Sequence, residues 1–373
     1  MTLLLIGSGS SIQSTCVKFT SEHILYCKLR PYLNKVIVPS VEGIGSTEWV
    51  PLKPNPEIIE RKYLAFVLRS PQFVQYATSN VAGARMPRMS KRALGETKIP
   101  IPYPDDPARS LAEQRRIAAR LETLLGETRA LREEVQSMRR DLAQVMESAL
   151  AEAFPAPQQA AEGWGWMRLG ELLTHYDSGI WGNPADSSNG YPVLRSTNID
   201  NWELNLSADI AYRVIPSDRL SRYKLAWGDI IVTKSSGSPR LIGEAALVDI
   251  AESSQVYLFS NFLLRLRPNL EFINAKYLHF YLRSSRGREV IEQMHRTTSG
   301  LRNLQIQAYI SQNIPIPYPD DPARSLAEQR RIVASLERIA EETRALDASL
   351  AQDLRDLEAL EQSILAAAFR GEG

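Results

Sequence analysis

A block of 19 residues occurs twice in this chain without a single change. The sequence IPIPYPDDPARSLAEQRRI runs from Ile99 to Ile117 and again from Ile314 to Ile332, at a spacing of 215 residues. Solenoid and propeller repeats have periods of roughly 20–50 residues, so this spacing is too long for either architecture. The chain of 373 residues therefore carries one structural unit twice, with a variable region ahead of each copy. We expect its function to be two-fold as well.

The repeated block predicts an extended segment followed by a long helix. Its prolines exclude a regular helix over IPIPYPDDP. Ser110–Glu113 and Ser325–Glu328 then both read Ser-Leu-Ala-Glu, the capping-box pattern in which the Ser hydroxyl and the Glu carboxylate satisfy free amides of the first turn. We expect helices from about Ser110 to Phe154 and from about Ser325 to Phe369.

Apolar residues in both helices step by four and three over more than four heptads, which is typical of a coiled-coil seam. The expected seam consists of Ile117, Leu121, Leu124, Thr128, Leu131, Val135, Met138, Leu142, Val145 and Ala149, and of Ile332, Leu336, Ile339, Thr343, Leu346, Leu350, Asp353, Leu357, Leu360 and Ile364. Asp353 interrupts the second seam, and polar residues there can set the register. Each helix could pair with its counterpart in a second chain. Equal lengths and matching seams favour pairing within one chain, where the effective concentration is high.

Composition excludes several classes of protein. No apolar run approaches the roughly 18 residues of a membrane span, and the start lacks the basic region and cleavage site of a signal peptide. The two cysteines, Cys16 and Cys27, form no CxxC pair, so neither a disulfide framework nor a zinc site is indicated. We expect a cytoplasmic protein without membrane contact.

The net charge of +1 hides an asymmetry along the chain. Residues 1–98 hold 13 basic against 6 acidic side chains, and residues 155–319 hold 16 against 15. Residues 99–154 hold 8 against 10, and residues 320–373 hold 7 against 12. The variable regions are therefore neutral to basic and the helical regions acidic. This distribution suits variable regions that approach a phosphate backbone, although ordinary solvated surface would explain it equally well.

The second variable region predicts an α+β domain with a twisted sheet and one or two helices. It follows a linker at residues 155–163. The β-branched and aromatic runs expected to form strands are Tyr191–Ile199, Gly228–Lys234, Gly243–Val248 and Asn261–Arg267. A helix is expected from about Asn274, as its N-cap, to Met294.

The first variable region parallels only the second half of that domain. Residues 24–28 correspond to 230–234, residues 47–50 to 260–263, and residues 62–70 to 276–284. About 20 residues precede Glu22, whereas about 60 lie between Trp166 and Gly228. We therefore expect the first domain to lack roughly 40 residues, and it stays open whether Met1 is the true start.

Basic and polar loops are the candidates for reading DNA, because Arg and Lys match guanine edges and Asn or Gln match adenine. For any one arginine of this kind, a surface ion pair is the more common role. Tyr32 and Trp49 fit packing residues better than platforms for bases. The candidates are Lys28, Arg30, Lys35, Arg85, Arg88 and Lys91 in the first region, and Arg195, Ser196, Thr197, Asn198, Lys234, Ser235, Arg240, Arg296, Thr298 and Arg302 in the second.

Little in the sequence points to catalysis. The four histidines lack the spacing of a metal site, and the chain has no phosphate-binding Gly loop and no nucleophile elbow. The acidic pair Asp105–Asp106 and its copy Asp320–Asp321 are explained by turn and helix-start chemistry. We expect a non-enzymatic chain without a cofactor or metal of its own.

In order and duplication, these segments resemble the DNA-specificity subunit of type I restriction-modification systems over nearly the whole chain. The resemblance rests on both IPIP–EQRRI segments and on residues 28–35, 190–199 and 228–234. It implies two target recognition domains (1–98 and 155–313), each reading half of a bipartite double-stranded DNA site. It also implies two helical segments (99–154 and 314–373) that form an antiparallel coiled coil and dock two methyltransferase subunits.

The resemblance further implies that the chemistry belongs to partner subunits. The methyltransferase would use S-adenosylmethionine, and a restriction-translocase subunit would use ATP and magnesium. Three alternatives stay open: a coiled-coil scaffold whose variable domains bind protein, an enzyme with an unrecognised site, and a shortened, partly inactive specificity subunit.

Overall fold

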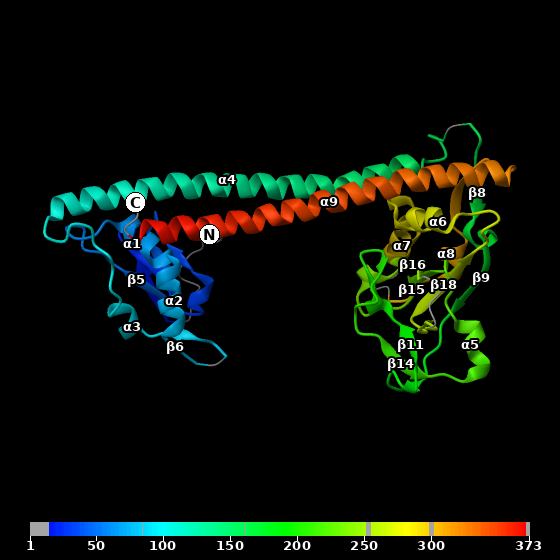
Figure 1. Cartoon of the computed structure of the whole chain (residues 1–373), viewed down its shortest axis with the longest axis horizontal. Coiled ribbons are helices and arrows are strands. Elements are labelled where there is room, and N and C mark those ends of the chain that lie inside the picture. Colours follow the sequence, from blue (N-terminus) through cyan, green and yellow to red (C-terminus); the bar gives the residue numbers. More distant parts are fainter. Residues whose placement is uncertain (1–14, 84, 161, 251–254, 298–301, 371–373) are drawn as a thin grey trace. The chain divides into compact units, whose positions relative to one another are not determined.

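The computed structural model describes residues 15–83, 85–160, 162–250, 255–297 and 302–370. The chain forms two compact units. Unit 1 combines the chain up to Arg139 with the chain from Ala348 onward, and unit 2 consists of Arg140–Asp347. In Figure 1, unit 1 contains the blue and cyan elements with the red end of the last helix, and unit 2 contains the green, yellow and orange elements.

Two helices of 47 residues, α4 (Pro107–Ala153) and α9 (Pro322–Ala368), each contribute to both units. In unit 1 the beginning of α4 packs against the end of α9, and Leu121 and Leu365 share one buried cluster. In unit 2 the end of α4 packs against the beginning of α9, where Leu150 and Leu336 share another (Figure 1). The two helices therefore pair antiparallel within one chain in both units.

The helices begin three residues earlier than predicted. Asp106 is the N-cap of α4, since its carboxylate accepts the N–H of Arg109 at 3.1 Å, and Pro107 follows at a position where a missing N–H costs nothing. The capping-box prediction is wrong, because Ser110 lies one turn inside the helix and Glu113 pairs with a neighbouring arginine. The second copy repeats this arrangement.

In each helix, the fifth, seventh and ninth residues of the expected seam are exposed and do not belong to the observed seam. Leu131 and Leu360, for example, are 49% and 46% exposed. The next residues take their places: Arg132 of α4 and Glu361 of α9 are half-buried, and their charged groups lie 3.3 Å apart. From Thr128 the buried positions step four then three instead of three then four, and at one of the new positions Arg132 pairs with Glu361 across the seam. The positions predicted wrongly are Leu131, Met138 and Val145 in α4 and Leu346, Asp353 and Leu360 in α9.

Unit 1 contains a small antiparallel sheet, in the order β3-β2-β5, covered by two helices. Its strands are β1 (Cys16–Phe19), β2 (Ile24–Cys27), β3 (Val36–Ile37), β4 (Gly43–Ser46), β5 (Trp49–Leu52), β6 (Val81–Ala82) and β7 (Arg88–Met89). Its further helices are α1 (Arg61–Arg69), α2 (Pro71–Ser79) and α3 (Lys91–Gly95). β1 pairs with β4 and β6 with β7. The core between sheet and helices includes Ile24, Tyr26, Leu68 and Phe73.

Unit 2 contains two four-stranded sheets, in the orders β16-β15-β18-β9 and β10-β14-β11-β17. Its strands are β8 (Trp164–Arg168), β9 (Leu173–Ser178), β10 (Asn183–Pro184), β11 (Tyr191–Leu194), β12 (Ile199–Asp200), β13 (Glu203–Leu204), β14 (Ala211–Val214), β15 (Ile230–Thr233), β16 (Ala245–Leu247), β17 (Leu258–Phe259), β18 (Leu263–Pro268) and β19 (Asn313–Pro317). Its further helices are α5 (Ser217–Tyr223), α6 (Ala275–Arg283), α7 (Ser285–Thr297) and α8 (Ile306–Ile310). The predicted α+β fold with long coiled-coil helices is confirmed.

The helix expected from Asn274 is in fact two helices. Asn274 is the N-cap as predicted, and its side chain accepts the N–H of Tyr277 at 3.1 Å. Ser284 ends α6 and caps α7, because its hydroxyl donates to the carbonyl of Tyr281 at 2.6 Å and accepts the N–H of Gly287 at 3.1 Å. A side chain on Gly287 would collide with the backbone of Tyr281, so the close turn depends on this glycine.

A buried glutamine of the repeated block attaches each variable domain to its long helix. Gln114 is fully buried, accepts the N–H of Glu60 at 2.8 Å and donates to the carbonyl of Ile58 at 3.0 Å. Gln329 makes the same two contacts in unit 2, with Asn274 at 2.8 Å and Phe272 at 3.1 Å. The repeated block is therefore the joint between variable domain and helix as well as the start of the helix.

Within the described ranges, no helix is long and apolar enough to cross a membrane. In the same part of the chain, no three His, Cys, Asp or Glu side chains gather as a metal site would require.

Candidate nucleic-acid interface

Three segments of unit 2 that are distant in sequence meet at Lys234, just after β15. The N–H groups of Lys234 and Ser235 both donate to the carbonyl of Phe262, at 2.9 and 3.0 Å. The carbonyl of Lys234 accepts the N–H of Leu304 at 2.7 Å, and Ser236 donates to the carbonyl of Arg302 at 3.1 Å. These backbone hydrogen bonds form a fixed frame for the side chains around Lys234.

The side chains on this frame are polar, basic and aromatic. The ammonium group of Lys234 donates to the hydroxyl of Ser178 at 2.8 Å, and burial lowers the pKa of Lys234. The hydroxyl of Ser235 donates to the side-chain oxygen of Asn303 at 2.7 Å. Phe262 is 52% exposed beside them, and Arg302 is exposed as well. Three of the candidate residues, Lys234, Ser235 and Arg302, are thus neighbours in the structure. Arg240 is exposed farther along the same loop.

Unit 1 has the same frame at the end of β2. The N–H of Lys28 donates to the carbonyl of Glu48 at 3.0 Å, and its carbonyl accepts the N–H of Met89 at 3.0 Å. Arg30 donates its N–H to the carbonyl of Pro87 at 2.8 Å, as Ser236 does to Arg302 in unit 2. The two units therefore share one backbone arrangement at equivalent places.

The side chains on the unit 1 frame are different. Arg88 forms an ion pair with Glu48 at 2.7 Å, and hydrogen bonding to Arg88 lowers the pKa of that carboxyl. Arg30 is exposed, with a left-handed backbone at φ 50°. Lys28 and Lys35 are half-buried, and the carbonyl of Lys35 accepts the N–H of Cys27 at 3.0 Å. Lys28, Arg30, Lys35 and Arg88 are thus neighbours, and Arg85 and Lys91 are exposed on the segments that flank β7.

The predicted alignment of the two domains is wrong by one residue at β5. Trp49 pairs with Cys27, as Leu263 pairs with Thr233 in unit 2. Glu48, rather than Trp49, therefore stands where unit 2 has Phe262.

The prediction for Asn198 is wrong. Asn198 is fully buried, and its side-chain oxygen accepts the N–H of Arg195 at 3.0 Å, while its amide donates to the carbonyls of Asn205 and Asp209. It therefore shapes the loop and presents no edge to a base. Arg195 is engaged in an ion pair with the exposed Asp209 at 2.9 Å.

The remaining candidates differ in how far the structure describes them. Ser196 is half-buried and Thr197 exposed, so DNA contact by these two stays a prediction. Arg296 lies in α7, but its side chain is outside the described part of the chain. Thr298 also lies outside the described residues.

Two aromatic sites were missed from the sequence. Phe262 is one, and Trp181, 40% exposed with the guanidinium of Arg213 stacked 4.0 Å from its ring centre, is the other. Trp181 follows Gly179, where any side chain would overlap the carbonyl of Phe259. The glycines on both sides of Ile180–Trp181 were the available signal for a tightly turned, presented aromatic residue.

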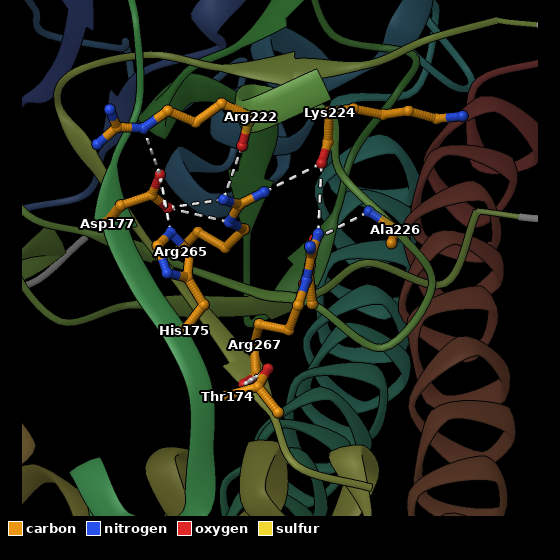
Figure 2. Close-up of polar contacts among 9 residues, drawn as sticks. Thr174, His175, Asp177, Arg222, Lys224, Ala226, Arg265 and Arg267 are labelled. Carbon is orange, nitrogen blue, oxygen red and sulfur yellow. Dashed lines mark hydrogen bonds and ion pairs between the residues drawn. The ribbon is translucent and has the colours of Figure 1, made fainter. Parts of the chain in front are cut away.

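A buried arginine fixes the neighbouring side of β9. Arg265 is 1% exposed and donates to the carboxylate of Asp177 and to the carbonyls of Arg222 and Lys224, at 2.9–3.0 Å (Figure 2). Burial lowers the pKa of Arg265, and the nearby Asp177 opposes that effect. Figure 2 shows His175 and Arg222 directed at the same carboxylate, at 3.3 and 3.8 Å.

This network fastens the end of α5 and the turn after it to the sheet. Arg267 adds an ion pair with Asp229 at 2.7 Å, and Ala226 donates its N–H to the same carboxylate at 2.9 Å. Successive residues of a strand point to opposite faces. In β9, Asp177 therefore faces the buried Arg265 on one side of the sheet, and the adjacent Ser178 contacts Lys234 on the other side.

Comparisons with known proteins were made in sequence and in structure. No protein-family model matches the chain. The specificity subunit of the type I restriction enzyme EcoKI from Escherichia coli (strain K12) is 24% identical over 331 residues, which cover 86% of this chain and 67% of that protein.

Two solved structures share the fold. A chain from a study of complex assembly and conformational transition of the type I R-M system matches with a TM-score of 0.75 and 25% identity, over 95% of this chain and 83% of that one. The HsdS subunit from Thermoanaerobacter tengcongensis matches with a TM-score of 0.56 and 26% identity, over 95% and 82%. The similarity thus extends over most of this chain in both sequence and fold.

Proposed function

Because the chain belongs to the family of type I restriction enzyme specificity subunits, we propose that it directs such an enzyme to a bipartite DNA site, one half read by each unit. The recognition domains are residues 1–98 and 155–313, supported by residues 99–154 and 314–373. The observation that carries the proposal is the frame after β2 and β15. Its backbone hydrogen bonds are equivalent in the two units, but its side chains are not.

The chemistry of the two frames suits different base sequences. Unit 1 presents Lys28 and Arg30, which match the acceptors of guanine. Unit 2 presents Ser235 and Asn303 beside Phe262, which favours mixed donor–acceptor edges and apolar contact with a thymine methyl group. A protein that recognises two half-sites of different sequence requires equivalent frames with different side chains.

Two equivalent surfaces are candidates for docking two methyltransferase subunits. In unit 1, Lys62 pairs with Glu122 of α4 at 2.7 Å, and Arg69 and Arg129 line the adjoining groove of about 440 Å³. In unit 2, Lys276 pairs with Glu337 of α9 at 2.6 Å, in a groove of about 660 Å³ with two arginines at the equivalent positions, Arg283 and Arg344. The same ion pair and the same two arginines recur at equivalent positions in both units, and such a duplicated arrangement suits identical partners.

Exposed apolar residues on the long helices add to these surfaces. Leu131, Met138 and Leu360 in unit 1, and Val145 and Leu346 in unit 2, lie outside the coiled-coil seam and are 43–49% exposed. In this proposal the docked methyltransferases supply S-adenosylmethionine chemistry, and a restriction-translocase subunit that joins through the complex supplies ATP- and magnesium-dependent steps. The chain itself binds and positions.

DNA binding by the chain assembled with its methyltransferase subunits tests the proposal. We expect affinity to fall steeply between 50 and 200 mM salt, since phosphate contacts release counterions. Arg30→Ala should weaken binding to the preferred duplex by about 1–3 kcal/mol, the value of a lost bidentate contact. Phe262→Ala should weaken binding through the loss of apolar contact, and both changes, at exposed positions, should leave helix content unchanged. Salt-insensitive binding, or binding to every duplex alike, would favour a protein-binding scaffold instead.

A further inference from the structure

Unit 1 has an apolar groove where the extended part of the repeated block runs past the paired helices. Its volume is about 530 Å³. The groove lies between the Pro100–Tyr103 segment, Ile117 and Leu121 of α4, and Ile364 and Phe369 at the end of α9. All of these belong to unit 1. The candidate DNA frame lies elsewhere in this unit, so the groove is not part of it.

Unit 2 contains the same residues in a different environment. There the second copy of the block forms β19, which pairs antiparallel with β8, so that Ile314 lies opposite Met167 and Ile316 opposite Gly165. Trp164 and Met167 of β8 pack against the core formed with the two long helices. Strand β8 therefore covers in unit 2 the surface that no described strand covers in unit 1.

Identical side chains of the repeated block are more deeply buried in unit 2 than in unit 1. Ile314 and Ile316 are 0% and 2% exposed, and Pro315 is buried. Ile99 and Ile101 are half-buried, and Pro100 is exposed. Among the described residues of unit 1, no strand pairs with Ile99–Ile101, and their backbone groups have no recorded hydrogen bond apart from the carbonyl of Pro100.

The direction of that hydrogen bond shows which edge is open. The carbonyl of Pro100 accepts the hydroxyl of Tyr63 at 2.9 Å, as Pro315 accepts that of Tyr277 at 2.7 Å. Polar groups of successive residues in an extended chain alternate in direction. Ile101 therefore points its N–H and C=O away from Tyr63, toward the side where β8 lies in unit 2.

From this geometry we propose that the Ile99–Ile101 edge of unit 1 is a strand-addition site for an extended segment of another polypeptide. The chemistry of the occupant follows from β8: bulky apolar side chains at the positions of Trp164 and Met167, which pack against the core, with a glycine at the position of Gly165. In unit 2 a side chain on Gly165 would overlap Pro319, and the repeated block places Pro104 at the equivalent position of unit 1. Main-chain hydrogen bonds supply affinity in such sites and the alternate side chains supply specificity.

Binding of a fluorescent peptide with the sequence of residues 162–172 (EGWGWMRLGEL) to the full chain tests the proposal. Fluorescence anisotropy should show saturable binding of one peptide per chain, because β8 of unit 2 is held in place by its own covalent connection. Peptides with Trp164→Ala or Met167→Ala, or with an N-methyl group on Gly165, should each bind at least about tenfold more weakly.

Matched variants of the protein locate the site. Ile101→Pro removes the N–H that faces the groove but keeps the chain extended, and it should weaken binding at least about tenfold. Pro102→Ala adds an N–H on the other side of the segment and should leave binding unchanged. Unaltered helical circular dichroism in both variants shows that the fold is intact.

Three outcomes contradict the proposal. The first is failure of the peptide to bind the full chain, and the second is equal binding to the Ile101→Pro variant. The third is strong binding only to a chain that lacks residues 2–14, which would assign the groove to a segment of the same chain.

Discussion

The two copies of the repeated block have the same sequence and the same internal contacts but different surroundings. Arg109 stacks on Tyr103 at 3.7 Å and Arg324 on Tyr318 at 3.6 Å, and both copies have the same Ser–Gln and Glu–Arg contacts. Among the residues that the structure describes, the second copy alone has a partner strand, β8. Local sequence therefore fixes the conformation of the block, while burial depends on what the rest of the chain places against it.

The two domains likewise share some elements and differ in others. Unit 1 has equivalents of β15, β16, β18, α6 and α7, and both units share the glutamine joint to the long helix. Within the described residues of unit 1, the second sheet of unit 2 and the cluster around Val193 and Phe259 have no counterpart. The joint and the backbone frame after β2 and β15 are thus the parts that the units have in common, and predictions that compare equivalent positions test this division.

The largest difference between the copies is expected at one pair of isoleucines. Ile316→Ala should destabilise unit 2 by about 2–5 kcal/mol, the usual effect of truncating a buried aliphatic side chain. The same change at Ile101 should cost less than about 1 kcal/mol, because Ile101 is already half-exposed. Hydrogen exchange of amides in α6 and α1 measures each unit separately. Equal losses would mean that the first copy is covered as well.

The glutamine joint should respond equally in both units. Gln114→Leu and Gln329→Leu each remove the partner of one backbone N–H and one backbone carbonyl, at about 0.5–1.5 kcal/mol per hydrogen bond. Protection of α1 should fall in the first variant and that of α6 in the second, by similar amounts. A large effect in one unit alone would contradict the equivalence of the two joints.

A smaller difference is expected in acid. Burial, with a contribution from Arg283, lowers the pKa of His279 to about 4, whereas the equivalent position in unit 1 is Ala65. Between pH 6.5 and 4 the unfolded chain binds a proton that the folded chain does not, so stability falls as pH falls. The loss should be about 1 kcal/mol at pH 5.5.

His279→Ala removes this contribution and isolates it from carboxylates that titrate in both proteins. The stability difference between pH 7 and pH 5.5 should therefore be smaller in the variant, measured by urea unfolding at each pH. An identical pH dependence in the variant and the parent protein would show that His279 is not held neutral.

The sequence predicted elements whose signals are local. Asn274 as an N-cap, the strands around Ile231 and Leu264, and the existence of both long helices follow from capping chemistry and hydrophobic pattern. The break at Ser284 was missed because Ser285 replaces the proline that marks the same break in unit 1, at Pro71.

Errors occurred where tertiary contacts decide. The seam prediction failed at Leu131 because Arg132 finds Glu361 on a helix more than 200 residues away. The polar loop at Asn198 looked like a base reader, but its amide is used to close the loop itself. Phe262 was missed because nothing in a short apolar run shows which side chain faces solvent.

Selection of bound duplexes from a random DNA pool, by the chain together with the methyltransferase subunits proposed for it, distinguishes two DNA-reading units from one. If both units read DNA, we expect two blocks of specified bases separated by a spacer of fixed length and free sequence. Arg30→Ala should relax one block and Phe262→Ala the other. A single block that Phe262→Ala alone affects, or no selected sequence at all, would contradict the claim that both units read DNA.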